Sequence, residues 1–295
     1  MSSKNDRVLA AKGAGVKRMA ALIRQHGHAH GPYTIFRDFI TLGALAVANG
    51  AEKGSLIYDQ REERYMRIVG GYERAVVDAA TEFFGLLVNE LEDSPRDVLG
   101  ELYMLMEFSN SDAGQFFTPF EVSRLMAGVT LSHATPENMP ARGYWRISEP
   151  ACGAGGMLVA AALELRKLGV NTSYQVHVEA VDVDELCVMM CYLQVSLMGM
   201  PGVVIHGNSL SGKVHAVWKT PIHCLYGWDY RLSRDAAQDE PVPAEQAAHD
   251  AAALVEIAPA ARRQPMPAAP AGRPVDVVAT FKPAPQGKTA QLSLF

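Results

Sequence analysis

The sequence predicts an α/β protein in which a helical region precedes a parallel sheet. Three observations lead to this fold class. Between residues 143 and 230, short β-like runs alternate with helical runs, which is typical of βαβ units with right-handed crossovers. A loop of small residues, Cys152 to Gly156, joins the first of these strands to its helix. Through residues 56–108, apolar residues recur at helical spacing.

Composition divides the chain into five parts. They are residues 1–55, a basic arm and loop; 56–135, a helical region; 136–232, the α/β domain; 233–290, an Ala/Pro-rich linker; and 291–295, an apolar tail. Within the helical region, Ser94-Pro95 is predicted to start a helix, because proline is favoured in a first turn. The α/β domain has room for four or five strands, so its sheet is expected to be short.

Charge and composition exclude several classes of protein. The net charge of −5 gives no overall signature of nucleic-acid binding, and no apolar run is long enough for a membrane span. No signal peptide opens the chain, so a cytoplasmic location is expected. The spacing of the four cysteines matches no zinc pattern, and buried thiols are favoured for them. No metal site is expected.

The strands and helices of the α/β domain are expected in a fixed order. "WRIS" at 145–148 is the first strand and is followed by a helix over 156–168. "VHVEAVDV" at 176–183 is the second strand, followed by a helix over 184–198, and "GVVIHGNS" at 202–209 is the third. Ligands of such sheets bind beyond the carboxyl ends of the strands, where the Gly/Ala loop lies.

The loop offers a ligand no side chain beyond a thiol and a methyl group. A ligand is therefore expected to lie on backbone amides at the start of the following helix. Asp182, at the end of the second strand, suits a ribose diol, because both hydroxyls can donate to one carboxylate. The alternative is structural: packing glycines, with Asp184 as a helix N-cap. The loop and Asp182 leave both interpretations open.

Four short segments of the sequence together resemble a known protein family. "GQFFTP" (114–119), "EPACGAGG" (149–156), "VDVD" (181–184) and "HGNS" (206–209) resemble N-6 adenine-specific DNA methyltransferases. The likeness covers about residues 95–210 and is greatest to the modification subunits of type I restriction-modification systems. It implies a Rossmann-like sheet, DNA as substrate and S-adenosylmethionine as cofactor. The implied cofactor-binding residues are Phe117, Thr118 and Pro119; Glu149, Pro150, Ala151, Cys152, Gly153 and Gly155; Asp182 for the ribose; and Asn208 near the adenine.

The charge of Glu149 agrees with that cofactor. S-adenosylmethionine carries a sulfonium and an α-ammonium group, for which a carboxylate in the loop supplies a countercharge. A pyrophosphate would be repelled by the same carboxylate, and no Walker lysine follows the glycines. Adenosylmethionine is therefore favoured over NAD or a nucleoside triphosphate.

The catalytic element departs from the family's pattern. Methyltransferases of this kind carry Asn or Asp, then two prolines and then Phe or Tyr, after the third strand. This chain has no Asn-Pro-Pro, and "TPIH" (220–223) stands there instead. One interpretation makes Thr220, Pro221 and His223 a diverged catalytic motif, with the threonine as hydrogen-bond acceptor. The other makes them core and turn residues.

The last five residues, "QLSLF", resemble the peptide with which bacterial replication proteins dock into the sliding clamp. Gln291, Leu292, Leu294 and Phe295 are the residues that would bind. This resemblance implies a bacterial, phage or mobile-element protein. The alternative is that the apolar tail covers the domain's own sheet.

Three functional hypotheses follow. The first is a DNA methyltransferase acting on adenine N6 with a divergent catalytic loop, aided by a separate specificity subunit. The second is a catalytically degenerate protein that binds cofactor or DNA, is recruited to the clamp, and serves in antirestriction or an accessory role. The third is a methyltransferase acting on RNA or protein.

Overall fold

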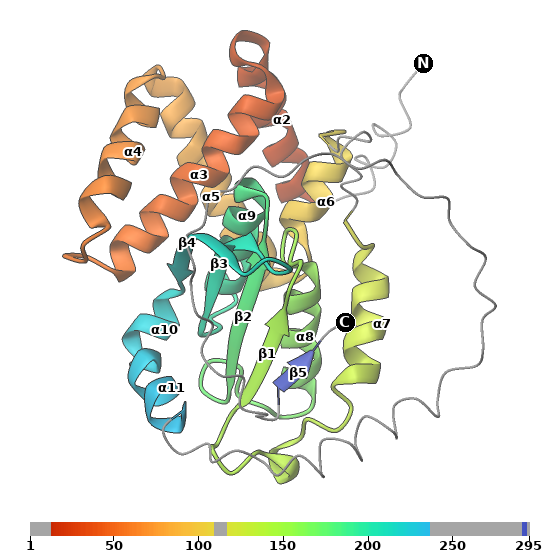
Figure 1. Ribbon diagram of the computed structural model, residues 1–295. Coiled ribbons are helices and arrows are strands. Elements are labelled where there is room, and N and C mark those ends of the chain that lie inside the picture. The colour runs from red at the N-terminus through yellow and green to blue at the C-terminus, as the bar shows by residue number, and fades with distance from the viewer. Residues whose placement is uncertain (1–12, 109–116, 237–290, 294–295) are drawn as a thin grey trace, which may run out of the picture. The chain divides into compact units, whose positions relative to one another are not determined.

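The computed structural model describes residues 13–108, 117–236 and 291–293. The chain divides into two compact units, residues 1–232 with 290–295, and residues 233–289. The first unit holds the helical region and the whole sheet (Figure 1).

The chain is helical well before residue 56. Helix α2 spans Ala14–His30 and helix α3 spans Pro32–Ala51. The prediction of a basic arm and loop for 1–55 is therefore wrong over residues 14–51. Val16, Met19, Ala20 and Ile23 of α2 are buried at helical spacing, because this face packs against α3 and α5. Residues 1–12 of the predicted arm lie outside the described residues.

Residues 56–108 form helices, as their apolar periodicity predicts. The helices are α4 (Tyr58–Gly70), α5 (Arg74–Asp93) and α6 (Val98–Leu105). Helix α6 begins later than the predicted start at Ser94-Pro95. Its N-cap is Asp97, whose carboxylate accepts a hydrogen bond from the amide of Gly100 at 2.9 Å. The acidic N-cap, and not the proline, fixes where the helix begins. Helix α7 (Phe120–Thr130) and a 3-10 turn, η2 (Pro136–Asn138), follow.

The predicted βαβαβ unit is confirmed. It consists of β1 (Trp145–Glu149), α8 (Gly156–Lys167), β2 (Val176–Asp182), α9 (Glu185–Leu197) and β3 (Gly202–Asn208). The three strands pair in parallel, with Glu149 opposite Ala180 and Asp182 opposite His206. The ends of β1 and β2 therefore meet at one edge of the sheet.

Two further strands complete a sheet of order β4-β3-β2-β1-β5 in the described part of the chain. Strand β4 (Lys213–Lys219) is antiparallel to β3. The two are joined by a turn in which Gly212 adopts a φ of 69°, which glycine tolerates without strain. At the other side, β5 (Gln291–Ser293) pairs in parallel with β1. The expectation of a short sheet agrees with this arrangement.

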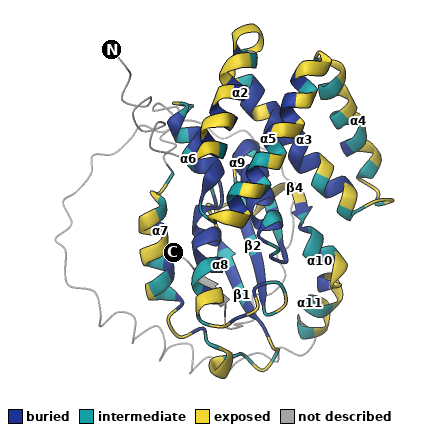
Figure 2. Ribbon diagram, turned by 180° about the vertical axis from the view of Figure 1, so that it is seen from behind, coloured by how far each residue is buried: buried dark blue, intermediate teal, exposed yellow. Residues whose placement is uncertain are grey.

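Helices cover the two faces of the sheet unequally. Helices α8 and α9 lie on one face, and α3 packs on α9 from outside (Figures 1 and 2). Helix α9 is buried along nearly its whole length, and Val178, Ala180 and Val204 of the sheet are fully buried. Helices α10 (Pro221–Leu225) and α11 (Trp228–Ala236) follow β4. None of the described helices is both long and apolar enough to cross a membrane.

Candidate functional site

The loop between β1 and α8 is shaped by two glycines with positive φ. Gly153 has a φ of 51° and Gly155 a φ of 94°. A Cβ atom on Gly155 would lie 3.1 Å from the Cα of Cys191, and one on Gly153 would lie 2.9 Å from the ring of Phe117. The second distance is shorter than real Cβ contacts, and the first is tight enough that Cys191 would have to shift. The loop therefore needs glycine for its conformation and also for its close contact with neighbouring elements.

The amides of this loop are engaged by the protein itself. Gly153 donates to the carboxylate of Asp182 at 2.8 Å, and Cys152 donates to the carbonyl of Val181 at 2.9 Å. Gly155 donates to Cys152, and Ala151 donates to Glu149. These four amides are therefore engaged, and the expectation that a ligand lies on backbone amides at the start of α8 stays a prediction for the amides of that helix. Beside the loop, the carboxylates of Glu149 and Asp182 are hydrogen-bond acceptors.

Glu149 is the most unusual of these acceptors. It ends β1, is 0% exposed, and accepts from the amide of Ala151 through Oε1 at 3.2 Å. Its Oε2 atom has no hydrogen-bond partner among the described residues. Burial, with the nearby carboxylate of Asp182 adding to it, raises the pKa of Glu149 to about 7. A buried acceptor without a partner is costly, so a donor from a ligand would complete this site.

Asp182 and Asp184 have different tasks. Both oxygens of Asp182 accept backbone amides, from Gly153 at 2.8 Å and from Asp184 at 2.9 Å. Burial raises the pKa of Asp182 above its ordinary value despite these bonds. Asp184 caps α9 by accepting from Leu186 and Cys187, so the helix-cap interpretation of this residue is confirmed. Asp182 joins the loop to β2 and keeps lone pairs for a hydroxyl donor.

The structure brings Phe117 to the loop. Its ring packs on Gly153 and lies 5.2 Å from the ring of Tyr103. Thr118 and Pro119 follow as exposed residues just before α7, and Pro119 is its N-cap. Pro150 and Ala151 are exposed, whereas Cys152 is buried. Residues 114–116 of the "GQFFTP" motif lie outside the described residues.

Asn208 serves the turn after β3. Its Oδ1 atom accepts from the amides of Leu210 and Ser211, each at 3.0 Å. It lies two residues beyond His206, the residue opposite Asp182, and is therefore at the same edge of the sheet as the loop. These two hydrogen bonds give Asn208 a structural role in the turn that needs no ligand.

Thr220, Pro221 and His223 are not brought together with the loop. Because β4 runs antiparallel to β3, it returns the chain to the amino ends of the parallel strands. Thr220 bonds the amide of Gly202 at 3.0 Å and the carbonyl of Met200 at 2.8 Å. Val178, the partner of Gly202 on β2, precedes Asp182 by four residues, roughly 13 Å along a strand. The catalytic hypothesis for these three residues therefore conflicts with their position.

These residues instead have structural partners. Thr220 is the N-cap of α10 and Pro221 its first residue, which together are a common helix start. His223 is buried, with Nδ1 at 3.0 Å from Nε2 of His177 and Nε2 at 3.1 Å from Asp229. Burial lowers the pKa of His223. The alternative of core and turn residues fits these contacts.

A turn signal in the sequence identifies the reversal of the chain. "NSLSG" at 208–212 stands between two β-like runs, and "KVHAVW" alternates as an edge strand does. Sequence reasoning also missed two buried residues, Asp97 and Gln194, which bond to each other, and Gln194 also bonds to the loop. Only the spacing of Asp97 before Gly100 marks it in the sequence, as a helix N-cap.

The fold and the site, with a Gly-rich loop after β1 and carboxylates at the ends of β1 and β2, are compatible with a methyltransferase-like α/β module. The comparison with protein families agrees with this class. Residues 94–226 match the family model of N-6 DNA methylase. The match runs from the start of α6 to the end of α10, less than half of the chain, and supports the assignment of this region to that family. No match was found among curated proteins.

The structure gives no support for a metal centre. Within the described ranges, no three His, Cys, Asp or Glu side chains lie close enough together to hold a metal ion. Cys152, Cys187 and Cys191 are buried thiols, as predicted.

Proposed function

We propose that this chain is an S-adenosylmethionine-dependent DNA methyltransferase acting on adenine N6, with its cofactor at the loop between β1 and α8. The observation that carries the proposal is Glu149, whose buried Oε2 atom lacks a donor within the described chain. An ammonium group is the donor that such a carboxylate favours most, because the bond is assisted by charge. The family match over 94–226 supports the same function.

The composition of the site supports this cofactor over a phosphate ligand. Glu149 and Asp182 present carboxylates at neighbouring strand ends, and four loop amides are engaged internally. Carboxylates repel a pyrophosphate and attract a cation. In the proposed site Glu149 holds the α-ammonium group, Asp182 accepts from the ribose hydroxyls, and Phe117 closes the side of Gly153. The cofactor supplies an activated methyl group; the chain supplies its position.

In this proposal the target adenine is not bound by Thr220, Pro221 and His223, the residues that the sequence indicated. Thr220 and His223 are fully engaged at the amino end of the sheet. Residues that hold the base must reach the carboxyl end, where the methyl group would lie. A segment outside the described ranges or a separate specificity subunit is the source that we propose for them.

A second candidate function has its own observation. The sequence contains no Asn-Pro-Pro, and of the residues that stand in its place Thr220 and His223 are buried. A protein that binds adenosylmethionine or DNA without transferring a methyl group would show this combination. Its role would be accessory or antirestriction.

The deciding experiment measures cofactor binding and methyl transfer separately. Calorimetry with S-adenosylmethionine tests the site, and labelled methyl transfer to adenine-unmethylated DNA tests the reaction. Glu149→Gln and Asp182→Ala are expected to weaken binding. Asp184→Ser is the matched control, because it removes a neighbouring carboxylate while serine still caps α9.

Each outcome has a defined meaning. Label on N6-methyladenine that falls in Glu149→Gln at sub-saturating cofactor and persists in Asp184→Ser supports the enzyme. Binding without label supports the second candidate. Label that survives DNase points to RNA or protein as substrate. No binding by the wild-type chain refutes the proposed cofactor site.

The clamp-binding role of the tail is a separate proposal. Gln291–Ser293 forms β5 beside β1, and residues 294–295 lie outside the described range. The strand favours the tail's alternative role of covering the sheet, because the same residues cannot pair with β1 and occupy a clamp groove at once. Co-sedimentation of the full chain with a bacterial sliding clamp, compared with a chain ending at residue 290, tests the partner.

A further inference from the structure

The peptide between Ala154 and Gly155 is held at one of its polar atoms by the loop itself: the N–H of Gly155 donates to the carbonyl of Cys152 at 2.8 Å. Gly153 and Gly155 both have positive φ. Glycine populates positive and negative φ almost equally, so the residues of the loop hold this conformation only weakly. A contact from outside the loop to the Ala154 carbonyl therefore adds to the turn hydrogen bond.

Gln194 of α9 provides that contact. Its Nε2 atom donates to the carbonyl of Ala154 at 2.7 Å, and its side chain is 0% exposed. The same Nε2 donates to Oδ1 of Asp97 at 2.8 Å, while Oε1 accepts from the amide of Leu99 at 3.3 Å. These bonds fix which end of the carboxamide faces the loop, because a reversed amide would place oxygen against two acceptors.

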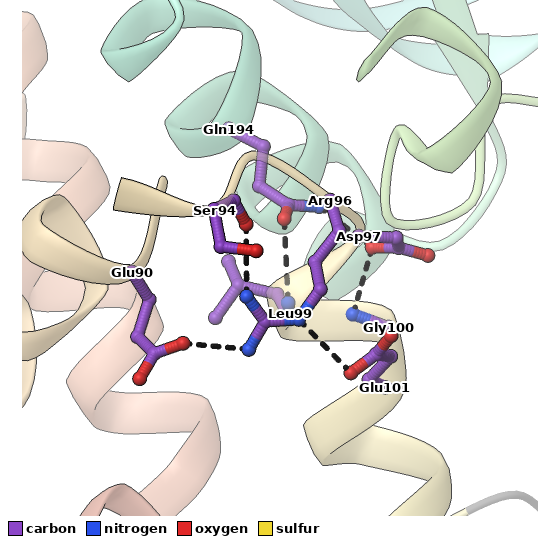
Figure 3. Close-up of polar contacts among 8 residues, drawn as sticks. All are labelled: Glu90, Ser94, Arg96, Asp97, Leu99, Gly100, Glu101 and Gln194. Carbon is purple, nitrogen blue, oxygen red and sulfur yellow. Dashed lines mark hydrogen bonds and ion pairs between the residues drawn. The ribbon is translucent and has the colours of Figure 1, made fainter. Parts of the chain in front are cut away.

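Asp97 in turn is held from several sides (Figure 3). It is 5% exposed and accepts from the amide of Gly100 at 2.9 Å as the N-cap of α6. A Cβ on Gly100 or on Gly156 would come within 2.1 Å or 2.8 Å of its Oδ2, so glycines on both α6 and α8 make room for it. The carboxylate is thus fixed between two helix N-termini, which favour a negative group.

The segment before Asp97 is tied to the helical region. Arg96 donates to Glu90 of α5 at 2.6 Å and to the carbonyl of Ser94 at 2.8 Å, and its Nε lies 3.4 Å from Glu101 (Figure 3). The side chains of Arg96 and Glu90 are mostly buried. Polar contacts therefore run without interruption from α5 through α6 and α9 to the loop.

We propose that Gln194 and Asp97 are positioning residues of the cofactor loop: Gln194 sets the orientation of the Ala154 carbonyl, and Asp97 sets the orientation of Gln194. The inference rests on the proposed cofactor site and adds to it the part played by the N-terminal helices. Neither residue touches the ligand. Both act by keeping the loop in the conformation that presents Glu149 and Asp182.

The test compares three variants of the full chain. Gln194→Met preserves length and removes the donor to Ala154. Asp97→Asn preserves Oδ1 as the acceptor for both Gly100 and Gln194. Thr172→Val is the matched control, because it removes another buried hydrogen bond, from Arg166 at 3.0 Å, that has no link to the loop. Thermal unfolding, amide hydrogen exchange of residues 152–156 and the Kd for S-adenosylmethionine are measured for each.

The expected pattern separates positioning from stability. Gln194→Met removes three hydrogen bonds, of which only the one to Ala154 reaches the loop. Loss of that one bond should raise the Kd and the exchange rates of residues 152–156 by about tenfold. Asp97→Asn should leave both within about twofold of the wild type, since Oδ1 still accepts. Thr172→Val should lower only the unfolding temperature. Gln194→Met that lowers the unfolding temperature but changes neither the Kd nor loop exchange would overturn the proposal.

Two further arms keep the test decisive. If the wild-type chain binds no adenosylmethionine, the proposed function fails, while loop exchange still tests the positioning role without any ligand. If Gln194→Met does not fold, Gln194→Leu replaces it, because leucine likewise has no donor for the Ala154 carbonyl. Unchanged loop exchange in Gln194→Leu would equally overturn the proposal.

Discussion

The two ends of the sheet carry buried polar residues that differ in how far their hydrogen bonds are satisfied. At the carboxyl end, Glu149 is buried with one oxygen lacking a donor among the described residues. At the amino end, Thr220 and His223 are equally buried, yet the threonine hydroxyl and both ring nitrogens of the histidine have partners. Satisfied buried groups stabilise a fold, whereas an unsatisfied one marks a place prepared for a ligand.

The largest expected effect concerns the loop at the carboxyl end. Gly155→Ala should lower the free energy of unfolding by about 2–4 kcal/mol. Alanine is strained at the φ of 94° that Gly155 adopts, and its Cβ would be in close contact with Cys191. Chemical denaturation measures it. Gly212→Ala is the control: its φ is 69° but no atom lies within 4 Å of the added Cβ, so about 1 kcal/mol is expected. Equal losses would show that the contact with α9 adds nothing.

The second effect is a pH dependence of stability. The folded-state pKa of Glu149 is raised to about 7, so the folded protein holds a proton that the unfolded chain has released. Stability should therefore fall as pH rises from about 4.5 to about 7, by on the order of 2–3 kcal/mol. Glu149→Gln should remove this slope. Urea unfolding of both proteins from pH 4.5 to 8 tests it, and parallel slopes would contradict the assignment to Glu149.

The third effect tests the amino end directly. Thr220→Val should lower the free energy of unfolding by about 1–3 kcal/mol, because it leaves the amide of Gly202 without its acceptor. Cofactor affinity should stay unchanged. Methyl transfer that is lost in this variant while the cofactor still binds would restore the catalytic hypothesis for Thr220 and break the contrast between the two ends.

The fourth effect is on affinity. Glu149→Gln should weaken S-adenosylmethionine binding by about tenfold at pH 8, where the wild-type carboxylate is ionised. Binding to the wild type near pH 6.5 should release a proton, because the bound cation favours ionised Glu149. Calorimetry in two buffers of different ionisation enthalpy measures the proton. Identical affinities at pH 8 would place the ammonium group elsewhere.

The smallest effect concerns Asn208. Asn208→Ala removes two hydrogen bonds in a partly exposed turn and should lower the free energy of unfolding by about 1 kcal/mol. If Asn208 contacts the cofactor's adenine, affinity should fall as well. A change in stability alone would limit the residue to its turn.

Periodicity and the rhythm of strands and helices suffice to predict much of the fold. The parallel unit from β1 to β3 follows from them because three short apolar runs are separated by two stretches with the length and pattern of helices. The helices at 14–51 were not predicted, because Gly27, Gly31 and three histidines resemble a loop in composition. Packing against α3 and α5 overrides that local preference.

The candidate site is predictable in part for the same reasons. Glu149, Asp182 and the glycines lie at strand ends, where pattern and position coincide. The direction of β4 cannot be read from the residues of the strand itself, because it depends on the five-residue turn before it. The antiparallel direction places Thr220 and His223 at the amino end of the sheet, opposite to the end where a catalytic role would need them. Gln194 is one polar residue in an apolar helix, and nothing near it in sequence reveals that its partners are Asp97 and Ala154.

The two edges of the sheet also differ in how they can form. Strands β3 and β4 are joined by a turn of a few residues, so their pairing needs little loop closure and belongs to the microsecond events of folding. Strand β5 must find β1 across about half of the chain. Closure of so long a loop carries a larger entropy cost, in exchange for a ladder of only three residue pairs. We therefore expect β4 to pair with β3 early in folding. We expect β5 to be the last strand that joins the sheet and the first that leaves it.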